Sequence, residues 1–343
     1  MGSVKDLVVL NSPIEDRPGR GKFVFSNRYS VFDWGEMPDH IPRKGEALCL
    51  IGAHFFEKLE EQDIKTHYLG LEENGKVKKL AELENPSKVM QVQLFKVIQP
   101  PLLGNNYDYS IYQNVTGNFL IPFEFIYRNF LPQSSSFRKR AARGEINLSD
   151  FGLSRLPDPQ EPLEPPLIDV STKLEEQDRY LSWSEVLSYR IINQKEHKLI
   201  KELVLKIDQL ISREVEALSL CNEDGKVELA FDAGRNLIVV DVIGTPDECR
   251  YTYQGLQMSK EIARHFYRQT EWYKEVQEAK QKNKLGWKAF VKSKPPRLPE
   301  ELLQLISWVY QRITNDLTGR EWFKEVPSLS AIASRLKRYL GGK

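Results

Sequence analysis

The sequence predicts an α+β protein built in two lobes. Segments rich in β-branched and aromatic residues dominate the first third of the chain. Helical periodicity dominates the chain after Gln254, and a strand-rich segment at Gly225–Ile243 lies between two helical regions. Strands followed by helices, a hairpin and further helices are typical of this fold class.

In the first third we expect strands on both sides of one helix. Gly45–Glu60 predicts this helix because its apolar residues, from Leu48 to Leu59, repeat at helical spacing. The predicted strands are Lys22–Ser26, Val89–Val97, Tyr107–Tyr112 and Asn118–Tyr127, with a turn at Gly104–Asn106.

The remaining elements follow from proline content and periodicity. Leu153–Leu167 predicts an extended connection, because proline interrupts both helices and central strands. In the Gly225–Ile243 hairpin, the turn Asp232–Asn236 supplies residues that tight turns prefer. The predicted helical segments are Trp183–Leu220, Glu300–Leu317 and Ser328–Leu340, with a break at Lys294–Pro299.

Composition limits the classes of partner. The 343 residues include 49 Lys+Arg and 48 Asp+Glu, a net charge of +1, so no global field attracts nucleic acid or anionic lipid. No apolar run approaches the roughly 18 residues of a membrane span. Three scattered cysteines predict no disulfide framework and suit a reducing, cytoplasmic setting. We therefore expect small-molecule partners, with neither nucleic acid nor membrane.

Two carboxylates, Glu228 and Asp241, lie on the two arms of the predicted hairpin. Asp241 follows the apolar run Leu237–Val240, and an acid at the end of a buried strand is costly unless it is paired or binds a metal. Two such acids on neighbouring strands could hold Mg²⁺ against nucleotide phosphates. The alternative, solvent-facing edge residues paired with lysine, fits the position equally well.

The turn Gly244–Arg250 follows directly. It would place Asp247 and Arg250 at the strand end, where the planar guanidinium group could bind phosphate. An ordinary capped loop is the alternative. Strand parity puts Glu124 and Arg128 on one side, which predicts a partly buried ion pair. The basic segment Phe137–Arg143 is interpreted as a solvated loop.

Taken together, these segments resemble the phosphoribosylaminoimidazole-succinocarboxamide synthase (SAICAR synthetase) family. The most specific match is the Thr-Pro-Asp turn that ends in Arg250, with Asp241 before it. The other matches occur in the family's order along most of the chain: Asn27–Asp33, Ile41–Leu48, Ile121–Ser134, Ser171–Asp178, Lys226–Phe231, Ser259–Trp272 and Lys294–Gly319.

The resemblance implies a fold related to ATP-grasp proteins and kinases. Residues 1–118 would form a small β-rich nucleotide-binding lobe, and residues 119–343 a larger α/β lobe with the substrate and metal site and the C-terminal helices. It implies ATP-dependent joining of L-aspartate to the carboxylate of aminoimidazole carboxylate ribonucleotide through an acyl phosphate. ATP and Mg²⁺ would be required, and a homo-oligomer is expected.

The resemblance also implies roles for individual residues. Glu228 and Asp241 would hold Mg²⁺ and orient the phosphates of ATP, with Lys5 beside them. At a hinge, Asn118 and Leu120 would offer backbone groups to adenine. The ribose phosphate and azole carboxylate would be bound by Arg128, Ser134 and Arg250, with Asp247 nearby. Positive charge around the transferred phosphoryl group would come from Lys226, Lys260 and Arg264, and the cleft wall from Lys173 and Asp178. The aspartate side is assigned to Arg28, Ser30 and Lys44.

The chain departs from the family pattern in several places. In the first-strand segment Gly2–Asp6, Ser3 occupies the position of the first lysine and only Lys5 is retained. Segments 97–117 and 144–166 are longer than in compact members. Two alternatives follow: a related ligase with a different acid or amine substrate, and an inactive nucleotide-binding regulatory protein.

Overall fold

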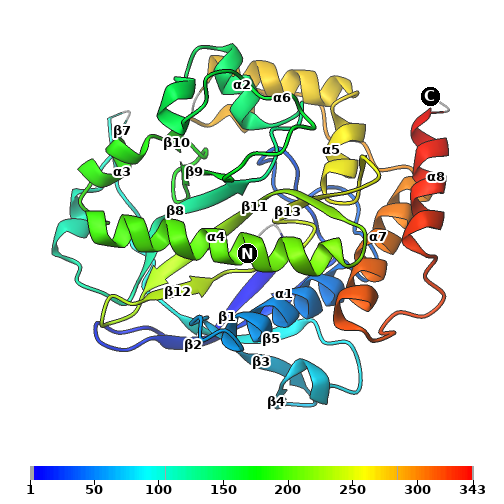
Figure 1. Ribbon diagram of the computed structural model, residues 1–343, viewed down its shortest axis with the longest axis horizontal. Coiled ribbons are helices and arrows are strands. Elements are labelled where there is room, and N and C mark those ends of the chain that lie inside the picture. The colour runs from blue at the N-terminus through cyan, green and yellow to red at the C-terminus, as the bar shows by residue number, and fades with distance from the viewer. Residues whose placement is uncertain (1–3, 105, 284, 342–343) are drawn as a thin grey trace.

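The structure is a computed structural model that describes residues 4–104, 106–283 and 285–341 (Figure 1). Gly2, Ser3 and Asn105, which the sequence analysis considered, lie outside these ranges. The N-terminal sheet has the strand order β1-β2-β5-β3-β4, and helix α1 packs against it. These elements are β1 (Lys5–Asn11), β2 (Gly19–Phe25), α1 (Lys44–Glu60), β3 (Tyr68–Glu73), β4 (Lys76–Lys78) and β5 (Val89–Leu94).

A second, larger sheet has the order β10-β9-β8-β11-β13-β14, and β12 also pairs with β11. Its strands are β8 (Phe119–Arg128), β9 (Leu167–Thr172), β10 (Tyr180–Leu181), β11 (Cys221–Phe231), β12 (Leu237–Val240), β13 (Cys249–Tyr253) and β14 (Leu256–Gln257). The long central strand β11 lies between β8 and β13, so residues of β8, β11 and β13 can meet on one face.

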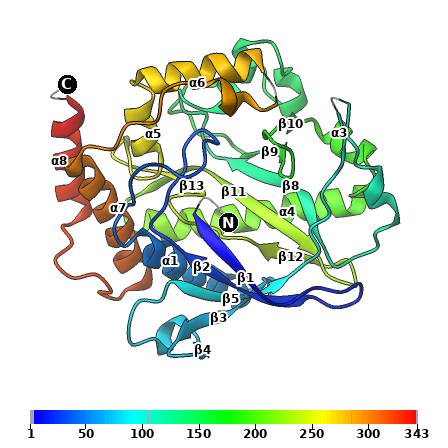
Figure 2. The ribbon, with the colours of Figure 1, turned by 180° about the vertical axis from the view of Figure 1, so that it is seen from behind.

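Helices surround this sheet. Helix α4 covers one face and β1 lies on the opposite face, as the two views show (Figures 1 and 2). Among the described residues, no helix is both long and apolar enough to cross a bilayer. The helices are α2 (Ser136–Ala142), α3 (Trp183–Ser188), α4 (Gln194–Glu216), α5 (Glu261–Tyr267), α6 (Glu271–Lys282), α7 (Glu300–Thr318) and α8 (Leu329–Gly341). Short 3₁₀ turns are η1 (Leu80–Glu82), η2 (Ser110–Asn114), η3 (Leu148–Phe151) and η4 (Trp287–Phe290), and β6 (Leu102–Leu103) pairs with β7 (Asn106–Tyr107).

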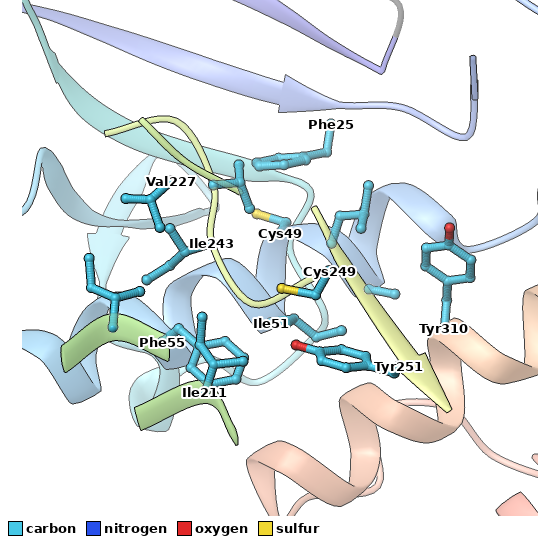
Figure 3. Close-up of a cluster of buried hydrophobic side chains, with 14 of the residues drawn as sticks. Phe25, Cys49, Ile51, Phe55, Ile211, Val227, Ile243, Cys249, Tyr251 and Tyr310 are labelled. Atoms are coloured by element: carbon cyan, nitrogen blue, oxygen red, sulfur yellow. The ribbon is translucent and has the colours of Figure 1, made fainter. Parts of the chain in front are cut away.

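One hydrophobic core joins the two sheets. Phe55 of α1 and Ile211 of α4 belong to the same buried cluster as Val227 of β11 and Tyr251 of β13 (Figure 3). Beyond this core, a backbone bridge pairs Thr66 with Val239. The two sheets therefore share one core, and the lobe boundary at residues 118/119 stays a prediction.

Most predicted elements are confirmed, one predicted strand is wrong, and one helical region is interrupted. The predicted strand Tyr107–Tyr112 is replaced by η2, because Asp108 accepts hydrogen bonds from the backbone N–H and the Oγ of Ser110, at 2.8 and 2.9 Å, and turns the chain. The predicted helical region Trp183–Leu220 is divided into α3 and α4. Asn193 caps the new start by accepting from the N–H of Glu196 at 2.9 Å.

Gly225 permits close packing at the centre of the sheet. A Cβ atom there would lie 2.1 Å from the Tyr127 hydroxyl oxygen and 2.9 Å from the Cys249 sulfur. We expect Gly225→Ala to lower the free energy of unfolding by about 1–3 kcal/mol, the usual cost of overpacking a core, measured by urea unfolding. Gly234→Ala, in the turn of the same hairpin, is the matched control because its nearest contact is an Asn236 side-chain nitrogen at 3.2 Å. Equal effects of the two substitutions would contradict this account.

Candidate functional site

A cleft of about 860 Å³ lies between β1 and the face of the second sheet that α4 does not cover. It gathers most of the residues singled out from the sequence. Those that line it are Lys5, Ser30, Arg128, Lys173, Asp178, Lys226, Glu228, Asp241, Asp247, Arg250, Lys260 and Arg264. Arg28, Lys44, Asn118, Leu120 and Ser134 do not line it.

Carboxylates and lysines alternate at the centre of the cleft. Glu228 of β11 pairs with Val240 in the hairpin ladder, which brings Asp241, the next residue, beside it. Lys173 Nζ lies 2.5 Å from Glu228 Oε2, and Lys5 Nζ lies 2.7 Å from Asp241 Oδ1. Burial would raise the pKa of both carboxyl groups, and Asp241 would raise that of Glu228 further, but the lysines outweigh these effects and lower the pKa of both. Both carboxylates are therefore ionised at neutral pH.

Asp241 has an unusual backbone conformation, with φ at 64°. Residues in this left-handed region are sparse outside glycine, and asparagine and aspartate tolerate it best. The backbone oxygen of Asp241 lies 3.1 Å from Nε2 of the buried His67. The strain is concentrated at the residue that turns its carboxylate into the cleft, as is common at functional sites.

Glu124, which the sequence predicts to pair with Arg128, belongs instead to this group of carboxylates and lysines. Lys226 Nζ donates to Glu124 Oε1 at 2.8 Å and to Glu228 Oε1 at 2.9 Å, because Glu124 and Glu228 are direct partners in the β8–β11 ladder. Burial, only partly offset by Lys226, raises the pKa of Glu124 to about 7. The parity of Lys226 and Glu228 on one strand, matched to that of Glu124 on the other, was the signal that could have revealed the group.

Arg128 is buried between two aspartates, so the expected Glu124–Arg128 pair is wrong. Its Nη2 lies 2.9 Å from Asp169 and its Nη1 lies 3.2 Å from Asp224. Nη2 also donates to Ser136 Oγ at 3.1 Å. Asp169 comes from β9 and Asp224 from β11, and strands that neighbour β8 only in space could not be identified from the local sequence.

Removing this buried cation should damage the fold more than removing an exposed one. We expect Arg128→Met to lower the free energy of unfolding by about 3–5 kcal/mol, because it removes a buried cation shared by two carboxylates and leaves Asp169 with Arg140 and Asp224 with Arg250. Arg143→Met is the matched control: its ion pair with Glu145 at 3.1 Å is exposed, and such pairs contribute about 0–1 kcal/mol. Chemical unfolding of both variants measures the difference, and similar losses would show that Arg128 is not a structural cation.

A cluster of positive side chains surrounds Glu261 at the far end of the cleft. It consists of Arg250, Lys260, Arg264 and Arg268 and is called the cationic group. Arg264 Nη1 and Arg268 Nη1 lie 3.3 and 2.5 Å from the Glu261 carboxylate. Burial would raise the pKa of Glu261, but the arginines, including Arg250, lower it to about 2. Burial and repulsion by Arg264 lower the pKa of Lys260. One carboxylate thus faces several cations, and buried nitrogens of Arg250, Arg264 and Arg268 have no hydrogen-bond acceptor among the described residues.

The basic segment Phe137–Arg143 is not a solvated loop but forms helix α2. Phe137 is fully buried, and Arg140 forms an ion pair with Asp169 and stacks on Tyr180. Lys139 follows Ser136, which lines the cleft, by three positions and so shares its helix face, although Lys139 itself does not line the cleft. Burial, followed by repulsion from Arg268, lowers the pKa of Lys139.

The carboxylate of Asp247 is hydrogen-bonded by two side chains from other elements. Lys44 is fully buried and donates to Asp247 Oδ2 at 2.7 Å, and the Tyr310 hydroxyl of α7 donates to Oδ1 at 2.6 Å. Lys44 therefore lies behind the cleft wall. Arg28 pairs with Asp6 at 2.7 Å, and Ser30 Oγ accepts from the Gly35 N–H at 3.3 Å. Tyr310 was missed because nothing in its helical pattern distinguishes it from a core tyrosine.

The backbone groups of the expected hinge are already paired. Asn118 O accepts from the Lys96 N–H at 3.0 Å, and the Leu120 N–H donates to Lys96 O at 2.9 Å. The Asn118 side chain donates to Arg17 O at 2.8 Å and so holds the β1–β2 connection. Asn118 O and the Leu120 N–H are thus paired with Lys96, and the hinge role stays a prediction. The nearby hydroxyl expected from Ser134 is replaced at the cleft wall by that of Ser136.

Comparisons with known proteins agree on one family. The family model for SAICAR synthetase matches residues 12–284. A protein of Archaeoglobus fulgidus, provisionally named phosphoribosylaminoimidazole-succinocarboxamide synthase, is 51% identical over 99% of this chain and 100% of its own. The solved SAICAR synthase of Saccharomyces cerevisiae, complexed with SAICAR, is 21% identical with a TM-score of 0.61 over 94% of each chain. A SAICAR synthetase in complex with ADP is 19% identical with a TM-score of 0.57 and covers 93% of this chain and 97% of its own.

Proposed function

The chain belongs to the SAICAR synthetase family, and we propose that the cleft on its second sheet carries out the reaction of that family. The protein is an ATP-dependent carbon–nitrogen ligase of purine biosynthesis, which joins L-aspartate to a carboxylated aminoimidazole ribonucleotide. The observation that carries the site assignment is the pair Glu228 and Asp241, both ionised in a cleft that also contains a cationic group.

The charge pattern suits ligation through an acyl phosphate. A carboxylate is a poor acyl donor because oxide would have to leave, and phosphorylation supplies a better leaving group. Bringing the carboxylate to ATP juxtaposes two anions, so fixed cations lower the cost of their approach. Lys173 and Lys226 provide such cations. Glu228 and Asp241 raise the pKa of Lys173 to about 12, which keeps it charged despite burial.

The two carboxylates also fit Mg²⁺, although they form no larger cluster. No group of three or more His, Cys, Asp or Glu side chains arranged for a metal occurs in the described part of the chain. Mg²⁺ usually takes one or two protein carboxylates together with substrate phosphates. Glu228 and Asp241 would hold it, and the ion would neutralise phosphate charge. Lys5, now paired with Asp241, would then be free to face a phosphate.

The phosphate of the ribonucleotide is assigned to the cationic group. Arg250, Arg264 and Lys260 line this end of the cleft, and Lys139 adds a further charge. Arg128 acts indirectly in this proposal: it holds Asp224, which also lies 3.4 Å from Arg250. Arginine is suited to the terminal phosphate because its fork can donate two parallel hydrogen bonds.

The nucleotide is assigned to the β1 side. Leu7 and Val9 are 51% and 52% exposed and share the strand face of Lys5, so an adenine ring could cover them. Arg28 and Ser30 stay predictions for the aspartate side. A cytoplasmic location, a homo-oligomeric state and the absence of nucleic-acid binding also stay predictions.

A direct assay tests the function. Purified protein, ATP, Mg²⁺, L-aspartate and the carboxylated aminoimidazole ribonucleotide should give ADP, phosphate and the succinocarboxamide. ADP formed only with another acid or amine would favour a related ligase, and ATP binding without turnover would favour a regulatory protein. Omitting Mg²⁺ should abolish turnover, and unchanged activity in the presence of a chelator would refute the metal assignment.

A further inference from the structure

The geometry points to Tyr107 and Tyr109 as positioning residues for the loop that carries Lys173 and Asp178. This inference rests on the proposed function of the cleft, and it concerns a segment that no step of that function uses. The segment, residues 97–104 and 106–117, is called the strap below. It lies outside both main sheets and contains β6, β7 and η2.

Both ends of the strap meet beside the first strand of the second sheet. Lys96 precedes the strap, and its backbone pairs with the residues that follow it, Asn118 and Leu120, at 3.0 and 2.9 Å. The strap is therefore a closed excursion with a fixed base. The strap can fix the position of a neighbouring segment only if the residues far from its base are also held in place.

Three side chains of the strap bond to the connection between β9 and β10. The Tyr109 hydroxyl donates to Glu175 Oε1 at 2.8 Å, and the Glu176 N–H donates to the Tyr107 hydroxyl at 3.0 Å. The Gln99 side chain also donates to the carbonyl oxygen of Leu174. Three consecutive residues of the connection are thus bonded to three side chains of the strap.

This connection begins and ends in the cleft. Lys173 at its start lies 2.5 Å from Glu228, and Asp178 near its end lines the same cleft. Between them the backbone makes no ladder pairing within the second sheet, since β9 ends at Thr172 and β10 begins at Tyr180. The Lys173 N–H donates to Pro122 O at 3.1 Å, so the start of this connection is fixed on β8, and the residues that follow depend on contacts from outside the sheet.

Tyr109 is a rigid anchor for this purpose. It is 3% exposed, and its ring stacks on Tyr189 with centroids 4.5 Å apart and an interplanar angle of 24°. The Glu175 side chain is 7% exposed and is also approached by Arg179 at 3.4 Å. A buried carboxylate bound by a fixed hydroxyl fixes the backbone beside it. The strap thereby preorganises Lys173, which acts on the reacting charges.

The test separates this role from simple stabilisation. Tyr109→Phe keeps the ring stacking and removes only the hydroxyl. We expect kcat of ligation to fall roughly three- to tenfold, the range set by losing one hydrogen bond, with KM for ATP unchanged. We also expect glutamyl endopeptidase to cut after Glu175 and Glu176 several-fold faster under native conditions. Tyr107→Phe removes the other hydroxyl and should act in the same direction.

Tyr112→Phe is the matched control. Its buried hydroxyl donates to the carbonyl oxygen of Ile98 within the strap and does not contact the loop. It should lower the melting temperature about as much as Tyr109→Phe, without changing kcat or the cleavage rate. Wild-type kcat and cleavage in both Tyr107→Phe and Tyr109→Phe, or equal effects of Tyr112→Phe, would overturn the inference. The cleavage rates decide this even if the wild-type protein shows no ligase activity, a result that would instead refute the proposed function.

Discussion

Replacing Asp241 by asparagine is expected to reduce kcat of ligation by roughly a hundredfold or more while leaving the fold intact. The substitution removes one of two ionised carboxylates at the centre of the cleft, and groups that organise charge in a transition state contribute effects of about this size. Asparagine suits the backbone at this position, because φ is 64° and asparagine tolerates left-handed conformations. The backbone contact to His67 does not involve the carboxylate and should persist.

Asp232→Asn is the matched control for this variant. Asp232 lies in the turn of the same hairpin, where it accepts from the Gly234 and Asn236 backbone N–H groups at 2.9 and 2.8 Å, and it does not line the cleft. Steady-state kinetics with increasing Mg²⁺ and thermal unfolding should be measured for both. Near-normal turnover of Asp241→Asn would refute the metal role, and a large loss in Asp232→Asn would show that the hairpin is sensitive everywhere.

The hairpin shows how much the sequence could predict. Its turn residues, its two apolar arms and the acid after the second arm are local signals, and the structure places them as expected. The break between α3 and α4 was missed although it is also local. Asn193 and Glu196 form a capping box there, but the prediction rested on the apolar stripe from Leu203 to Leu218, which lies after the break and does not mark it.

Partners from distant strands could not be predicted in this way. The parity of Glu124 and Arg128 on β8 is correct, but their partners depend on which strands lie beside β8. Arg128 forms ion pairs with Asp169 and Asp224, whereas Glu124 forms one with Lys226. A single strand reveals which side chains share a face, and only the sheet order reveals which charges meet across it.

The basic segment around Lys139 illustrates a different difficulty. Its charge count suggests solvent, because isolated arginines and lysines are costly to bury. The compensating charge, Asp169, lies on β9, so the local sequence gives no reason to bury Arg140. Once Arg140 and Phe137 are buried, helix geometry puts Lys139 on the face of Ser136, which lines the cleft. The charge that was interpreted as solvated thus becomes part of the proposed phosphate site.

Arg250→Met is expected to raise KM for the ribonucleotide roughly ten- to a hundredfold with little change in kcat. A charged hydrogen bond contributes about 1.5–3 kcal/mol, and a contact to a non-reacting phosphate affects binding in the ground and transition states equally. The fold should survive, because Asp224 keeps its contact with Arg128 at 3.2 Å when Arg250 is removed. KM for ATP and for L-aspartate should stay within about twofold, since an effect on binding in one subsite adds little in the others.

A substrate without its phosphate identifies the contact directly. Wild-type protein should prefer the ribonucleotide over the corresponding nucleoside, and Arg250→Met should lose most of this preference because the truncated substrate has no anion for Arg250 to bind. Lys139→Met should lose a smaller part of the preference for the ribonucleotide. Arg143→Met, at the exposed end of the same helix, should lose none of it. If Arg250→Met raised KM for the ribonucleotide and for the nucleoside by the same factor, Arg250 would act on the azole or on the fold. The phosphate would then have to be bound elsewhere in the cleft.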